Sequence, residues 1–232
     1  YIIFGADRYI EFKRTGSSST EYKGKNGAAG VVHYASGSPD VWTYTDQHGN
    51  VTDFFGDNTA SHRADWQIWR MTDPAGNVCY VGDASSASTA VTSGYNADKT
   101  IAVAYDAATT AGGGGHRFTY TYSTIDSVSR LTQVKAEIKA GGTWASPTSP
   151  STVGQVDYAY YQTGDNTYGN NGNLKLVTIT TPLTDSGVSL VQKKLYRYYV
   201  GTYNGSTNPG NPDSMQMVVG FEGYRKYDWD QD

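Results

Sequence analysis

Apolar and polar residues alternate along much of the chain with the two-residue period of β-strands. Residues 116–139, HRFTYTYSTIDSVSRLTQVKAEIK, show this best, with two alternating runs separated by a short polar turn. The apolar positions of the two runs are Phe118, Tyr120, Tyr122, Val134, Ala136 and Ile138. This stretch predicts a β-hairpin whose one face is half-buried.

The same pattern recurs on both sides of this hairpin. It predicts hairpins at 41–55 and 66–83, and single strands at 99–106, 155–161, 174–181 and 189–201. Residues 1–14 and 31–35 predict an opening hairpin in which the polar residues 17–30 form a long loop. Residues 215–229 are interpreted as a last strand whose partner lies outside the chain, and we expect residues 1–232 to be a fragment of a longer protein.

Two stretches are less regularly patterned and are expected to be loop insertions. They are residues 84–115, which contain the strand candidate at 99–106 and four successive glycines (112–115), and residues 141–154, rich in Ser, Pro and Gly. A short helix near 84–92 is an alternative within the first stretch, although Ser and Thr disfavour it. No helix is expected after the glycines, so they predict a connector rather than a phosphate-binding loop.

The turns between strands share a local sequence. Asp or Gly is followed three residues later by Gly or Ser, then by Asn or Arg, then by Val or Leu. The four sites contain Asp46, Gly49 and Asn50; Asp73, Pro74, Gly76 and Asn77; Asp126, Ser129 and Arg130; and Gly169, Gly172 and Asn173. Asn77 follows Asn50 by 27 residues, Arg130 follows Asn77 by 53, about twice that interval, and Asn173 follows Arg130 by 43. This spacing predicts a repeated, hairpin-sized unit.

The repeated unit resembles that of the RHS/YD-repeat family, YxYDxxGRLTxV. Tyr120 to Tyr122 and Asp126 to Val134 follow its order, and residues 44–54 and 70–78 are similar to family variants. The chain departs from the pattern where Ser123, Thr124 and Ile125 are inserted and where Ser129 replaces the glycine.

The resemblance covers roughly residues 40–232 in patches and implies an all-β fold of stacked β-hairpins in a curved or spiralling antiparallel sheet. We expect residues 1–232 to form a single repeat region. The resemblance also implies a non-enzymatic module of a large exported protein, which forms a shell wall or a cell-surface scaffold. Expected partners are further YD repeats of the same polypeptide or of other copies, and a toxin cargo or a surface glycan. The expected location is extracellular or at the cell surface.

Composition and charge narrow the function classes further. Charged residues make up 17% of the chain, below the roughly 25% of an average domain, whereas aromatic residues make up 13% and 20 residues are Tyr. The net charge of −4 provides no basic field for nucleic acid. No apolar run approaches the ~20 residues of a membrane-spanning helix. The single cysteine, Cys79, allows no internal disulfide and no zinc site of its own, and we predict no cofactor or metal.

Residue types that carry catalysis are scattered. His33, His48, His62 and His116 lack metal-ligand spacing and a nucleophile motif, so none is assigned a catalytic role. Asp228, Asp230 and Asp232 could serve as calcium ligands or a glycosidase pair, but a solvated strand explains them more simply.

The tyrosine-rich strands indicate an alternative function for the chain. Tyr196, Arg197, Tyr198 and Tyr199, with Tyr158, Tyr160 and Tyr161, could stack against sugar rings, which predicts a carbohydrate-binding module. The structural interpretation, in which these rings pack across strands, is favoured.

Overall fold

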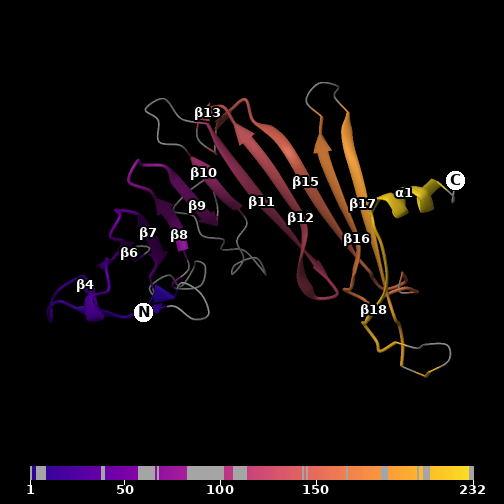
Figure 1. Cartoon of the computed structure of the whole chain (residues 1–232), viewed down its shortest axis with the longest axis horizontal. Helices are drawn as coiled ribbons and strands as arrows, with labels where there is room; N and C mark the ends of the chain where they lie inside the picture. The colour runs from indigo at the N-terminus through magenta and orange to yellow at the C-terminus, as the bar shows by residue number, and fades with distance from the viewer. Residues whose placement is uncertain are drawn as a thin grey trace. The chain divides into compact units, whose positions relative to one another are not determined.

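The computed structural model of the chain describes residues 2–3, 9–37, 40–56, 66, 68–82, 102–106, 114–142, 144, 146–165, 167–183, 188–202, 204–205 and 210–229. Its strands form one 14-stranded antiparallel sheet and two small two-stranded sheets. In the large sheet the strand order runs from β18 to β15, then β12 to β3, so sequence neighbours pair (Figure 1). The predicted antiparallel sheet of sequential hairpins is therefore confirmed.

The chain divides into two compact units, and β11 (Gly115–Ile125) and β12 (Val128–Lys139) contribute residues to both. Unit 1 comprises residues 1–117 and 139–150. Its other elements are β1 (Ile2–Ile3), β2 (Tyr9–Ile10), β3 (Phe12–Arg14), β4 (Glu21–Gly24), the 3₁₀ turn η1 (Lys25–Gly27), β5 (Val31–Ala35), β6 (Val41–Thr45), β7 (Val51–Phe55), β8 (Ile68–Thr72), β9 (Val78–Gly82), β10 (Ala102–Asp106), β13 (Gly141–Gly142) and β14 (Pro147–Thr148).

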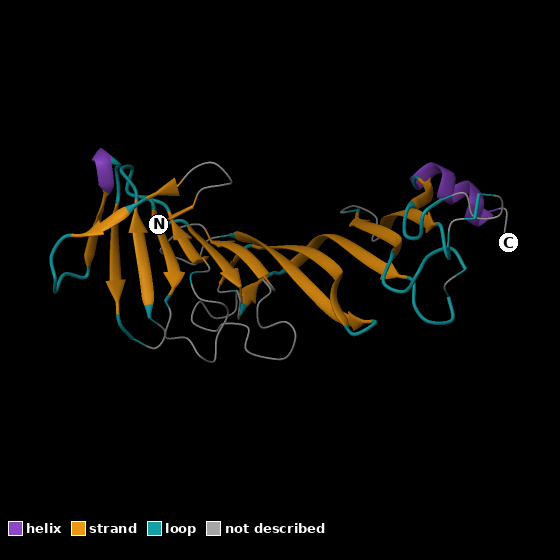
Figure 2. Cartoon of the chain, turned by 90° about the horizontal axis from the view of Figure 1, so that it is seen from below, coloured by secondary structure: helices purple, strands orange, loops and turns teal. Residues whose placement is uncertain are grey.

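Unit 2 comprises residues 118–138 and 151–232. Its other elements are β15 (Ser151–Tyr160), β16 (Leu174–Pro182), β17 (Ser189–Tyr198), β18 (Met215–Val219) and α1 (Phe221–Trp229). Long strands of the unit lie side by side in Figure 1, and Figure 2 shows α1 following them at the end of the chain.

The hairpin at 116–139 forms as predicted, through β11 and β12, but its expected half-buried face is only partly covered, because Phe118 is 42% and Ile138 44% exposed. Asp126 and Ser127 form its two-residue turn, and both have a positive φ, 52° and 61°. Two successive positive φ angles define the type I′ turn, whose twist matches that of the flanking strands. The predicted hairpins at 41–55 and 66–83 and the strands at 99–106, 155–161, 174–181 and 189–201 are also present as β6–β7, β8–β9, β10, β15, β16 and β17.

The predicted loop at 17–30 is wrong, because it contains β4. This strand pairs with β3 on one side and β5 on the other, so residues 1–14 and 31–35 do not form one hairpin. Tyr22 explains the difference, since its ring packs 5.3 Å from that of Trp42. This contact with a residue 20 positions away stabilises the short polar segment as a strand.

The predicted insertion at 141–154 is also partly wrong. Residues 151–154 belong to β15, and β13 pairs with β14 within the rest of the segment. Trp144 lies between them and is 4% exposed, so the segment is anchored by a buried ring. In the other expected insertion, Gly115 begins β11, whereas Gly112, Gly113 and the helix considered at 84–92 lie outside the described residues.

The last predicted strand ends at β18, and residues 221–229 form α1 instead. The segment lacks strict alternation, and Phe221 and Tyr224 are three residues apart, a helical spacing. Tyr224 lies 5.3 Å from the ammonium of Lys193 in β17. The interpretation of Asp228 as part of a solvated strand is therefore wrong, and Asp230 and Asp232 lie outside the described residues.

Candidate functional site

The turn between β6 and β7 is closed by a carboxylate and an amide. Asp46 Oδ1 accepts hydrogen bonds from the backbone N–H groups of His48 (2.8 Å) and Asn50 (2.9 Å). Asp46 Oδ2 accepts one from Asn50 Nδ2 at 2.8 Å. Gly49 takes the positive φ, 83°, that the turn requires. The Asn50 hydrogen bond is the main cause that holds the pKa of Asp46 below its ordinary value.

The turn between β8 and β9 repeats this arrangement. Asp73 accepts from the Asn77 backbone N–H at 2.9 Å and from Asn77 Nδ2 at 2.6 Å. Gly76 has φ 84°, and its N–H donates to the Asp73 carbonyl at 2.9 Å, as Gly49 does to that of Asp46 at 3.2 Å. The Asn77 side chain is again the main cause that lowers the pKa of the carboxyl. The two turns are therefore copies of one unit, and Pro74 occupies a position in the second where no N–H is needed.

Asp126 and Arg130 do not form this closure. Asp126 lies in the two-residue turn of the β11–β12 hairpin, whereas Arg130 lies in β12 and contacts other residues. Its guanidinium lies 5.5 Å from the Tyr160 ring, and a Cβ on Gly172 would lie 2.2 Å from the guanidinium nitrogen Nη2. Arg130 therefore packs one turn against the next, and Gly172 leaves the space for it.

The fourth turn takes its carboxylate from a distant loop. Asn173 Nδ2 donates to Asp213 Oδ1 at 2.9 Å, and Asn170 Nδ2 donates to the same oxygen at 2.9 Å. Both hydrogen bonds lower the pKa of Asp213. Gly172 has φ 85°, as the equivalent glycines do. Asp213 therefore accepts a hydrogen bond from Asn173 Nδ2, as Asp46 does from Asn50 Nδ2, although Asp213 lies 40 residues after Asn173 in the chain.

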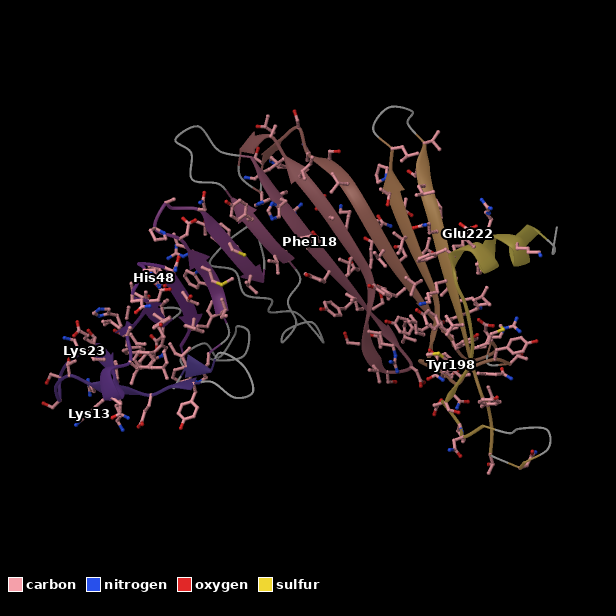
Figure 3. The ribbon with its side chains drawn as sticks, in the orientation of Figure 1. Lys13, Lys23, His48, Phe118, Tyr198 and Glu222 are labelled. Atoms are coloured by element: carbon pink, nitrogen blue, oxygen red, sulfur yellow. The ribbon has the colours of Figure 1, made fainter. Side chains whose placement is uncertain are left out.

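The tyrosines proposed for sugar stacking pack within unit 2. Tyr161 is 2% exposed, donates its hydroxyl hydrogen to the Tyr196 carbonyl at 2.8 Å, and meets the Tyr198 ring edge-on at 6.4 Å. Arg197 lies 3.9 Å from the centre of the Tyr168 ring. A Cβ on Gly210 would lie 1.9 Å from the Tyr199 ring. Figure 3 shows Tyr198 at the end of β17.

A row of polar side chains crosses β4 to β8 on one face of unit 1. Glu21, His33, Thr43, Asp53 and Arg70 occupy successive cross-strand pairs. Asp53 is 2% exposed and accepts from Thr43 Oγ1 at 2.7 Å and from Arg70 Nε and Nη2 at 2.8 and 2.6 Å. Both Arg70 nitrogens donate to Oδ2 and Thr43 donates to Oδ1, and these charge-assisted hydrogen bonds compensate the desolvation of the buried carboxylate.

The opposite face of unit 1 carries a row of aromatic side chains over a cavity of about 500 Å³. Phe12, Tyr22, Trp42, Phe54 and Trp66 line it, together with aliphatic side chains. The cross-strand pairs Tyr34–Trp42 and Trp42–Phe54 place these rings on one face. The described lining holds no charged side chain.

Trp42 is the centre of this aromatic row. Its ring lies 4.7 Å from Tyr34, 5.3 Å from Tyr22 and 5.3 Å from Trp66. The tilts of 37° to 57° are typical of offset aromatic packing. Tyr34 is fixed from the other end by its hydroxyl, which donates to the buried Asp40 at 2.8 Å. Tyr34 is therefore held at both ends, by the Trp42 ring and by the Asp40 carboxylate.

The remaining candidate residues lie apart from one another. His33 is 3.7 Å from Glu21, His48 contacts Gln47, and His116 stacks 4.9 Å from Tyr105, while His62 lies outside the described residues. Cys79 is half-buried in β9, and burial raises the pKa of its thiol.

Among the described residues, no three His, Cys, Asp or Glu side chains come together as a metal site would require. In the same part of the chain, no helix has the length and hydropathy needed to cross a membrane.

The comparisons with known proteins provide no further assignment. No protein-family model matches the chain, and no curated protein matches it.

Two parts of these sites were not predicted from the sequence. The aromatic row could have been found from the alternation of Tyr34, Trp42 and Phe54 with polar residues in neighbouring predicted strands. Asp213 could not, because no local pattern links it to Asn173.

Proposed function

We propose that the chain is a non-enzymatic structural module of a large exported RHS/YD-type protein, in which successive hairpins build a shell wall or a cell-surface scaffold. One observation carries this proposal: the turns at 46–50 and 73–77 share the same hydrogen bonds and the same glycine conformation. Repetition of this turn makes the β6–β7 and β8–β9 hairpins copies of one unit, and a single hairpin of this kind is stable only when neighbours add to the sheet.

The sheet edges also suit an extendable module. Among the described residues, β3 and β18 each have one ladder partner. β3 is short and carries Lys13 and Arg14, and charges on an edge strand discourage further pairing. β18, MQMVV, has no charged residue, and most of its residues are exposed. A further repeat of the same polypeptide or of another copy would pair there at little electrostatic cost.

The test is the full-length gene product, followed by electron microscopy of the purified protein. Further YD repeats with a C-terminal toxin-like domain, and a hollow particle that shields that domain from protease, are the expected results. A product without further repeats, or one that hydrolyses members of a polysaccharide panel, would overturn the proposal.

Carbohydrate binding is the alternative function. The intramolecular contacts of Tyr198, Tyr199 and Arg197 support a packing role for these side chains instead. Saturable binding on a glycan array that is lost in Tyr198→Ala, in a protein that keeps its β-rich circular dichroism spectrum, would favour the alternative.

A further inference from the structure

The aromatic cavity of unit 1 has the size and chemistry of a small-molecule site. Its volume of about 500 Å³ falls inside the range of roughly 300–1,000 Å³ that ligand sites occupy. The concave surface is set on β3 to β8, so its floor is a paired sheet rather than a loop.

Trp66 makes the cavity unusual. It is 55% exposed, although it lines the cavity and packs 5.3 Å from Trp42. Its φ is 68°, a left-handed conformation that a bulky residue rarely adopts. Its N–H donates to the Phe55 carbonyl at 2.9 Å, which holds the residue in place. Strained residues held in this way are concentrated at ligand sites.

The chemistry of the lining indicates the class of ligand. A charged ligand would lose its hydration without a compensating partner, because the described lining holds no charged side chain. A sugar needs hydrogen-bond partners for several hydroxyls, whereas the five aromatic rings offer only the Tyr22 hydroxyl and the Trp66 indole N–H, because the indole nitrogen of Trp42 is buried. A neutral aromatic ring needs no charged partner and no set of hydrogen-bond partners, and it gains offset stacking against Trp42 and Trp66.

We propose that this cavity binds a small, neutral aromatic molecule of one to three rings, stacked against Trp42 with Trp66 at the rim. The site is separate from the repeat turns and from the tyrosines of unit 2. The proposal does not depend on the shell or scaffold function, because it concerns one face of unit 1 and not the assembly of the sheet.

The test is a fluorescence titration with N-phenyl-1-naphthylamine, a neutral probe that brightens in apolar surroundings. We expect saturable binding of one probe per chain, weakened about tenfold or more by Trp66→Ala, which removes one stacking ring. Trp66→Phe should keep most of the affinity. Phe118→Ala is the matched control, since Phe118 is exposed in unit 2 and should leave binding unchanged (Figure 3).

A second variant separates loss of the site from loss of the fold. Ile68→Trp fills the cavity from β8 and should abolish probe binding, while the far-UV circular dichroism spectrum stays β-rich. The proposal fails if several probes bind per chain or if Trp66→Ala binds as tightly as the wild type. It also fails if cellobiose displaces the probe, because the site would then take sugars.

Discussion

Breaking the buried ion pair of unit 1 should cost more stability than breaking any exposed pair. Arg70→Met keeps an apolar stem over Trp69, whose ring lies 5.5 Å from the Arg70 guanidinium. The change removes both guanidinium N–H donors to Asp53, which keeps the hydrogen bond from the Thr43 hydroxyl. Removing one partner of a buried pair costs about 3–5 kcal/mol. The Arg70 side chain is 38% exposed, so water can reach the vacated position, and we expect the lower limit, about 3 kcal/mol.

The assay is equilibrium urea unfolding followed by tryptophan fluorescence. Asp53→Asn should cost less, about 1–2 kcal/mol, because the partly exposed Arg70 regains water and the amide oxygen still accepts one hydrogen bond. In the double variant the losses should not add, and the coupling should be at least about 1 kcal/mol.

The matched control is Arg225→Met in α1. Arg225 pairs with Glu222 at 3.3 Å, but both side chains are more than four-fifths exposed, so the change should cost less than about 0.5 kcal/mol. Equal losses for Arg70→Met and Arg225→Met, or additive losses in the double variant, would refute the reasoning.

Three further predictions concern the turns and the sheet edge. The pKa of Asp73 is lowered in the folded chain, so the stability that its carboxylate adds is present above the ordinary pKa of 3.8 and is lost as the pH falls through the folded pKa. Acid unfolding of Asp73→Asn should therefore lack the part of the stability loss that comes from protonating this carboxylate. Gly76→Ala should cost about 1–2 kcal/mol in urea because φ is 84°, whereas Gly154→Ala, which meets no atom within 4 Å and has no positive φ, should not destabilise. The chain should self-associate through β18, and Met217→Lys should shift sedimentation toward monomer; a monomeric wild type at high concentration would contradict this.

The bulge in β18 limits the strength of that association. The register between β17 and β18 shifts between Arg197 and Tyr198, which leaves an extra residue on the edge strand. A bulge bends the strand and interrupts regular pairing. Reversible self-association is therefore expected, rather than a permanent dimer.

Local sequence was enough to predict most of the sheet. Alternation placed β6 to β12 and β15 to β17, because a strand in a sequential hairpin meets partners that are close along the chain. Turn residues were equally informative where the closure is local: Asp73 and Asn77 are four residues apart, and Gly76 supplies the positive φ between them.

Only the tertiary structure decided the features that depend on distant residues. β4 is a strand because Tyr22 meets Trp42, and the Asn173 turn is completed by a carboxylate 40 residues away. The aromatic cavity likewise gathers side chains from β1, from β3 to β8 and from the turn residue Trp66. The sequence pattern alone suggests this grouping only once the strand register is known. The sequence by itself determined hairpins and turns, since their energetics are local, whereas the cross-strand register decided which side chains meet.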